Sequence, residues 1–183
     1  MNNLQAAENF VKERHAGMMR KDGTTPFYDH LLGVVARLKN LGVTDEDVLA
    51  AAWLHDTLED TRTSFVEIDS RFGSKVAVLV LSLSKDRSLP KAKQEEQYIK
   101  QLKEASLEAK LIKLCDISAN LKDIKNASLS KTKKVKTIRK VLCYLNAIKP
   151  DLVKNKASVP GIQSLTEGMN DLVVSFGQKP III

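Results

Sequence analysis

The stretch that decides the fold is Ala50–Thr61, AAAWLHDTLEDT, where an alanine-rich apolar run leads into the ionisable residues His55, Asp56, Glu59 and Asp60. On one continuous helix, residues four apart share a face, so His55 would align with Glu59 and Asp56 with Asp60. The preceding turns are apolar, which places these side chains at the edge of a core. Because an unpaired charge there would cost several kcal/mol, the pattern favours a bound metal ion.

Helical periodicity extends from this stretch in both directions, and strand alternation is almost absent. The spacing predicts a helix over 4–19, a second from Pro26 to a stop at Gly42, and a third from a Thr44 cap through the motif. A Ser64–Glu67 capping box begins a helix that ends at Gly73. Further helices are predicted over 76–83, 107–124 and 130–148, and a weaker one is punctuated by Gly161 and Gly168. The polar segment 84–97 reads as mobile. We therefore expect an all-α helical bundle: a single domain over residues 1–183, with a core of about 4–150 and a C-terminal helical extension, 151–183.

Composition limits the class of protein. Hydrophobic residues make up 43% of the 183 residues and charged residues 28%, as in a soluble globular domain. The sequence has no apolar run of the roughly 18 to 20 residues that a membrane span needs, and its N-terminus has no secretion-signal pattern. We therefore expect a cytoplasmic protein with no membrane partner. Cys115 and Cys143 both lie in apolar helical patterns, so we expect two buried, reduced thiols.

The net charge of +7 is concentrated in one segment, residues 122–140, where Asp123 is the single acid among many lysines and arginines. No aromatic residue lies in this segment, although platforms for single-stranded nucleic acid need aromatic side chains between the cations. A solvated helix face is the favoured interpretation. A rim that attracts phosphate comes second, and sequence-specific nucleic-acid binding comes last.

Two further positions offer metal ligands. His30 stands at the start of an apolar helix pattern, and Asp116 interrupts another apolar pattern with Asn120 one turn later. Together with His55 and Asp56 they supply two imidazoles and two carboxylates. Such a mixed set suits Mn²⁺, Fe²⁺ or Mg²⁺ better than structural zinc.

Three segments carry a resemblance to a known family. The order H…HD…D, with HDTLED as its centre, resembles the HD superfamily of metal-dependent phosphohydrolases. The segments HAGMMRKDGTTPFYDH (15–30), AAAWLHDTLEDT (50–61) and AKLIKLCDISANL (109–121) are similar to motifs of the hydrolase domain of the RelA/SpoT homologue family, in its small single-domain form. The similarity spans residues 10–144.

The resemblance implies hydrolysis of the 3′-pyrophosphate of ppGpp and pppGpp, the alarmones of the stringent response, with release of pyrophosphate and GDP or GTP. It also implies one Mn²⁺ per chain. By position, it assigns the metal to His30, His55, Asp56 and Asp116, catalysis to Glu59 as base and Asp60 as the orienting acid, and substrate contacts to Arg20, Lys21, Asn120 and Tyr144.

Departures from the family pattern keep alternatives open. Met18 stands where the family usually has glutamine, and Ile117 stands where it usually has lysine or arginine. The alternatives are an HD-fold phosphatase acting on another nucleotide such as NADPH, and a non-catalytic basic module that binds RNA or a ribosome. His15 also matches a family position, and we interpret it as a supporting or capping residue.

Overall fold

The computed structural model describes residues 2–183, and its regular secondary structure is helical, which confirms the predicted fold class. The helices are, in chain order, α1 (Asn3–Arg14), α2 (Phe27–Asn40), α3 (Glu46–Leu54), α4 (Thr57–Asp60), α5 (Phe65–Phe72), α6 (Ser74–Leu83), α7 (Lys91–Glu104), α8 (Leu107–Asn126), α9 (Lys131–Asn155) and α10 (Gly161–Ser175). Among residues 2–183, extended pairing is limited to an isolated bridge between Met19 and Pro26.

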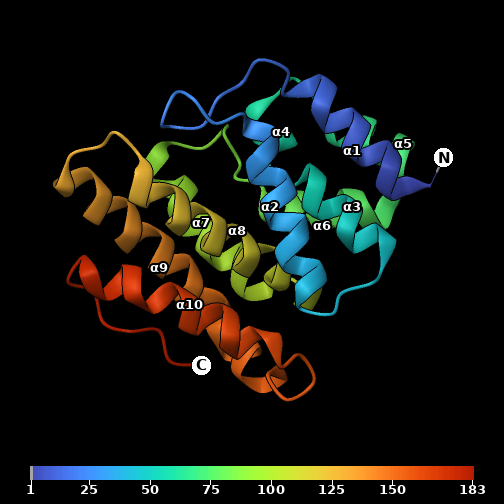
Figure 1. Ribbon diagram of the computed structural model, residues 1–183. Helices are drawn as coiled ribbons and strands as arrows, with labels where there is room; N and C mark the ends of the chain where they lie inside the picture. The colour runs from blue at the N-terminus through green and yellow to red at the C-terminus, as the bar shows by residue number, and fades with distance from the viewer. Residues whose placement is uncertain (1) are drawn as a thin grey trace.

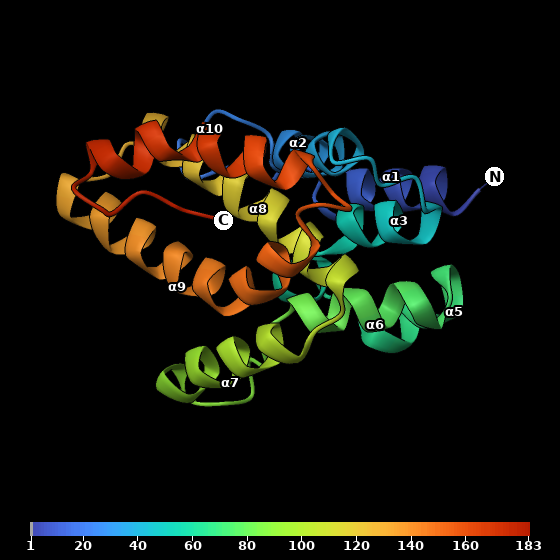
Figure 2. The ribbon, with the colours of Figure 1, turned by 90° about the horizontal axis from the view of Figure 1, so that it is seen from below.

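Helix α8 organises the packing, because it contacts α2, α3, α6, α9 and α10. Most of its residues are buried, including the charged Lys110 and Asp116. Figure 1 shows α8 running through the middle of the molecule, and Figure 2 shows α7 and α10 on opposite sides of α9. A charged residue on α8 is therefore enclosed by several helices that can supply partners.

The predicted continuous helix through the HDTLED motif is wrong. Helix α3 ends at Leu54, and α4 begins at Thr57 after a turn at His55 and Asp56. Asp56 has φ −96° and ψ −5°, which lies outside the regular helical range. His55 Nδ1 lies 2.8 Å from the carbonyl oxygen of Ala52, a bond that fixes its ring at the helix end. The turn interrupts the helix at His55 and Asp56. The backbone N–H of Asp60 still donates to the carbonyl of Asp56 at 2.9 Å, so the four-residue spacing expected between these two acids is kept.

The start of α3 also differs from the prediction. Asp45, not Thr44, is the N-cap, and its carboxylate accepts hydrogen bonds from the backbone N–H groups of Asp47 and Val48. Asp45 Oδ2 also lies 2.6 Å from Lys75 Nζ on α6. Asp45 therefore satisfies the helix end and ties two helices together.

Three further predicted boundaries fail. Helix α1 ends at Arg14 instead of continuing to residue 19. The other two fail because tertiary contacts override local signals. Residues 91–97 of the segment expected to be mobile belong to α7, which is anchored by buried Tyr98 and Leu102. Helix α9 continues through Pro150 to Asn155 instead of stopping at residue 148. Burial of Leu152 and a 2.5 Å ion pair between Lys110 and Asp151 stabilise the turn that contains the proline.

The two cysteines differ in environment. Cys115 is buried, as predicted, whereas Cys143 is exposed on α9, so that part of the prediction is wrong. Both thiols are free. Among residues 2–183, no helix combines the length and apolar character that crossing a bilayer requires.

The N-cap gives the first testable prediction. Asp45→Ala should lower the free energy of unfolding by about 0.5 to 2 kcal/mol, because the mutation leaves two backbone donors of α3 without their acceptor. Thr44→Ala is the control and should have little effect. Urea unfolding of both variants measures the difference. Equal losses in the two variants would contradict the assignment of Asp45 as the cap.

His15 gives a pH prediction. It is buried at the C-terminal end of α1 and stacks on Phe27 with 4.9 Å between ring centroids. Burial lowers the pKa of His15 below its ordinary value of 6.5. The unfolded chain therefore takes up this proton at a higher pH than the folded protein does, so stability should fall as the pH drops below 6.5.

The matched variant is His15→Phe, which keeps a ring against Phe27 and cannot titrate. The loss of unfolding free energy between pH 7.5 and pH 5.5 should be smaller in this variant than in the wild type. Urea titrations at both pH values measure it, and an unchanged loss would show that His15 does not contribute.

Candidate functional site

The four predicted metal ligands meet at one point. His30 comes from α2, His55 and Asp56 come from the turn between α3 and α4, and Asp116 comes from α8. His30 Nε2 lies 3.2 Å from Asp116 Oδ1 and 3.6 Å from Asp56 Oδ2. His55 Nε2 lies 3.3 Å from Asp56 Oδ2 and 3.6 Å from Asp116 Oδ1. Two imidazole nitrogens and two carboxylates thus surround a small common space.

The donor atoms fit a divalent metal ion. The Nε2 atoms of His30 and His55 are buried and make no hydrogen bond to residues 2–183. The contact of His55 Nδ1 with the Ala52 carbonyl accommodates a proton on Nδ1 and leaves the Nε2 lone pair free for a metal. Ligand atoms that share an ion at about 2 Å lie roughly 3 to 3.5 Å apart. Ligand atoms of His30, His55 and Asp56 lie within 4.8 Å of one another, and the spacing to Asp116 is similar.

Charge compensation also shapes the cluster. Burial opposes a proton on His55, but Asp56 and Asp116 outweigh burial and raise the pKa of His55 to about 10. Burial alone would raise the pKa of Asp116. Lys113 and the two histidines have the opposite and larger effect, so the pKa of Asp116 lies well below its ordinary value. Both carboxylates therefore carry negative charge, which a cation can neutralise.

The two predicted catalytic acids lie beside the cluster in different settings. Glu59 Oε1 accepts a 3.0 Å hydrogen bond from the backbone N–H of Lys85, and Glu59 lines a pocket together with Asp56 and Asp116. Asp60 pairs with Arg87 at 3.3 Å. Burial and the neighbouring acids Asp56 and Glu59 raise the pKa of Asp60.

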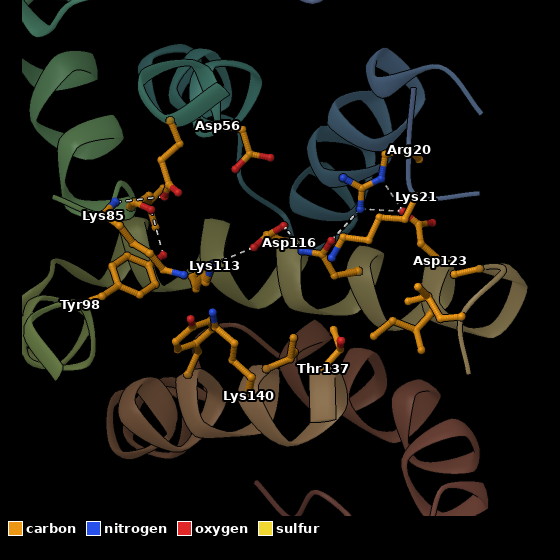
Figure 3. Close-up of a pocket in the computed structure, with 18 of the residues that line it drawn as sticks. Arg20, Lys21, Asp56, Lys85, Tyr98, Lys113, Asp116, Asp123, Thr137 and Lys140 are labelled. Carbon is orange, nitrogen blue, oxygen red and sulfur yellow. Dashed lines mark hydrogen bonds and ion pairs between the residues drawn. The ribbon is translucent and has the colours of Figure 1, made fainter. Parts of the chain in front are cut away.

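The pocket has a volume of about 270 Å³ and opens over the carboxylates (Figure 3). Arg20 and Lys21 lie at one end of it, and Lys85 and Tyr98 lie at the other, with Asp56 and Asp116 between them. All four residues predicted to contact substrate line this pocket: Arg20, Lys21, Asn120 and Tyr144. Apolar side chains from α8, α9 and their connection complete the wall, among them Ile124, Leu129 and Val141.

A tight loop before α2 positions Arg20. The backbone N–H of Arg20 donates to the carbonyl of Thr25 at 2.8 Å, and Gly23 takes φ +77°, a conformation that favours glycine. The guanidinium donates to Asn120 Oδ1 at 2.6 Å and to Asp123 Oδ2 at 2.9 Å. Arg20 is therefore held against α8 by residues that lie 100 and 103 positions later in the sequence.

Sequence reasoning missed several pocket residues. Lys113 pairs with Asp116 at 2.9 Å, and its Nζ lies 5.2 Å from the ring centroid of Tyr98 and 5.1 Å from that of Tyr144. Lys85 approaches the same two rings. A lysine three residues before a buried acid could have indicated the first pair, because positions i and i+3 are neighbours on a helix. No local signal identified Lys85.

Comparison with known proteins agrees with this geometry. The family model described as HD domain matches residues 7–145. The guanosine-3′,5′-bis(diphosphate) 3′-pyrophosphohydrolase of Danio rerio is 44% identical over 118 residues, which cover 63% of this chain and 66% of that protein. The protein of the same name from Homo sapiens is 40% identical over 123 residues, which cover 66% of this chain and 69% of that protein.

A solved structure shares the fold over nearly the whole chain. It is described as a metazoan ortholog of SpoT that hydrolyzes ppGpp and plays a role in starvation responses. It aligns with a TM-score of 0.83 and 25% identity, covering 98% of each chain. The resemblance found in the three sequence segments is therefore confirmed. The chain belongs to the HD-domain family, a family of metal-dependent phosphohydrolases, and its relatives there include SpoT-type proteins named as guanosine-3′,5′-bis(diphosphate) 3′-pyrophosphohydrolases.

Proposed function

We propose that this protein is a Mn²⁺-dependent hydrolase that removes the 3′-pyrophosphate of ppGpp and pppGpp and releases GDP or GTP. The observation that carries the proposal is the convergence of two carboxylates and two imidazole nitrogens that make no hydrogen bond within residues 2–183, beside Glu59, at a pocket of about 270 Å³. The names of the relatives support the same substrate. The whole chain would act as one hydrolase domain, with residues 151–183 as a helical extension.

The proposed metal ligands are His30, His55, Asp56 and Asp116. A divalent ion bound by them supplies a Lewis acid, which neutralises phosphate charge and lowers the pKa of water. Nitrogen and carboxylate donors together suit Mn²⁺. Lys113 helps to neutralise Asp116. Its ammonium group lies 2.9 Å from Asp116 Oδ2, while Asp116 Oδ1 faces the histidines.

Glu59 is the proposed general base. Its carboxylate lines the pocket, the N–H of Lys85 holds Oε1, and Oε2 lies 3.9 Å from the guanidinium of Arg87. Oε2 is the oxygen proposed to take a proton from the attacking water. Asp60 is the proposed orienting acid. Its raised pKa makes it a better proton acceptor than an ordinary aspartate, and Arg87 fixes its side chain.

The two ends of the pocket support a substrate with phosphate groups at two positions. Cationic residues lie on both sides of the carboxylates, with Arg20 and Lys21 at one end and Lys85 at the other (Figure 3). A nucleotide with one phosphate group would use only part of this charge. The apolar wall suits a base and a sugar, and Asn120 and Tyr144 are the proposed nucleoside contacts.

Metal binding should be visible without catalysis. Adding Mn²⁺ to metal-free protein at about 100 times its Kd should raise Tm by about 5 to 10 °C, because the ion binds the folded state and neutralises its buried carboxylates. Differential scanning fluorimetry measures the shift. Asp116→Asn should abolish it, and Asp171→Asn, which changes an exposed acid, should retain it. A full shift in Asp116→Asn would exclude Asp116 as a ligand.

Catalysis gives a separate prediction. Mn²⁺-loaded protein should release pyrophosphate from ppGpp, and Glu59→Gln should lower kcat about 10²- to 10⁴-fold, the usual contribution of a general base. The Mn²⁺-induced Tm shift should survive in this variant. Glu13→Gln, an exposed acid on α1, is the control and should retain full activity.

The same assay should include NADPH and should resolve pyrophosphate from orthophosphate. Faster release of orthophosphate from NADPH than of pyrophosphate from ppGpp would reject the proposed substrate while leaving the metal site intact. Undiminished turnover in EDTA would reject the metal-dependent reaction itself.

A further inference from the structure

A carboxylate outside the metal cluster holds three polar groups at once. Glu95 on α7 accepts hydrogen bonds from Lys140 Nζ at 2.6 Å and from Lys85 Nζ at 3.2 Å through its Oε1 atom. Its Oε2 atom accepts a short hydrogen bond from the hydroxyl of Tyr144. These donors come from α9 and from the chain after α6, so one acid connects three parts of the fold.

The three donors are also pocket residues. Lys85, Lys140 and Tyr144 all line the cavity described above, and Figure 3 shows the two lysines near Tyr98 and Lys113 at the end opposite Arg20. Two ammonium groups and a hydroxyl form the kind of donor set that phosphate oxygens bind. In the structure this donor set is directed toward a carboxylate of the protein itself.

The electrostatics show that the acid and its lysines depend on each other. Burial acts to raise the pKa of Glu95, but the bonds from Lys140 and Tyr144 outweigh it and lower this pKa to about 2. Burial and the positive charge of Lys140 lower the pKa of Lys85. The side chain of Lys85 is only 17% exposed, so its charge needs a nearby anion.

We propose that Glu95 is a built-in counter-anion that competes with a phosphate group of the bound nucleotide for Lys85 and Lys140. Without a ligand, Glu95 neutralises the two lysines and keeps Tyr144 in place. A phosphate group entering this end of the pocket must take the lysines from Glu95. The acid thereby limits the affinity of the site for nucleotides and disfavours weakly charged ligands. This inference rests on the proposed function only in requiring that the pocket accept a nucleotide phosphate.

A positioning role for Glu95 would change nucleotide affinity in the opposite direction. If Glu95 served to hold the lysines in their binding positions, its loss would let them move into solvent, and nucleotide affinity would fall. The isosteric change Glu95→Gln removes the charge but keeps an oxygen that can accept the Tyr144 hydroxyl. The sign of the change in affinity therefore separates a competitor from a positioning residue.

The test is equilibrium binding of GDP to the full chain by isothermal titration calorimetry at a fixed Mn²⁺ concentration and low salt. Glu95→Gln should bind GDP about three- to tenfold more tightly than the wild type, which is the range expected from removing two partly exposed ion pairs. The gain should shrink at high salt, because both the competition and the binding are electrostatic. Glu96→Gln, the same charge change at the exposed neighbouring residue, should leave GDP affinity unchanged.

GDP binding that is unchanged, weaker or undetectable in Glu95→Gln would overturn the inference. Failure of the proposed reaction has a different signature. A wild-type protein that does not hydrolyse ppGpp, alongside a Glu95→Gln variant that binds GDP more tightly, would reject the reaction and keep the role of Glu95. Normal ppGpp hydrolysis with no gain in GDP affinity would reject the role of Glu95 alone.

Discussion

The structure depends on the neutralisation of two acids placed at the edge of a helical core. Asp56 and Asp116 lie 3.2 to 3.6 Å from the Nε2 atoms of His30 and His55. The side chain of Asp116 is 5% exposed and that of Asp56 is 26% exposed, so their charges would destabilise the fold if nothing opposed them. The neighbouring histidines oppose that charge, and the proposed divalent ion would do so as well. The same arrangement of acids would then serve as a Lewis-acid site.

Helix α8 links this constraint to the pocket. Its residues Lys113, Asp116 and Asn120 lie on one side of the helix. Lys113 meets the aromatic rings of α7 and α9, Asp116 meets the histidines, and Asn120 meets the Arg20 loop. A shift of α8 would displace metal ligand and substrate contact together. This explains why polar and charged side chains can occupy a helix that is mostly buried: each of them has a partner on a different neighbouring element.

The sequence predicted the fold class, and it predicted the four side chains that the structure brings together as the proposed metal ligands, because both depend on patterns of residue type. Helical periodicity survives local irregularity, and isolated polar residues inside apolar patterns mark buried partners. The break after Leu54 was missed because nothing in the alternation of apolar and charged residues distinguishes a continuous helix from one interrupted by a turn at His55 and Asp56. The passage of α9 through Pro150 was missed because Lys110, forty-one residues earlier, holds Asp151 in place.

The Lys85–Glu95–Lys140 group could not be predicted for the same reason. Its members come from a loop and two helices, and each one alone reads as an ordinary surface charge. Only the three-dimensional structure shows that a single carboxylate holds two lysines and a tyrosine at the pocket. Long-range polar contacts of this kind, unlike helical faces, leave no periodic signal in a sequence.

The central claim is that four side chains, 86 positions apart at their extremes, share one cation. Anomalous diffraction from crystals grown with Mn²⁺ tests it most directly. The account predicts one strong anomalous peak within about 2.5 Å of ligand atoms from His30, His55, Asp56 and Asp116. A peak that lies elsewhere, or full Mn²⁺ exposure with no peak between the two histidines, would contradict it.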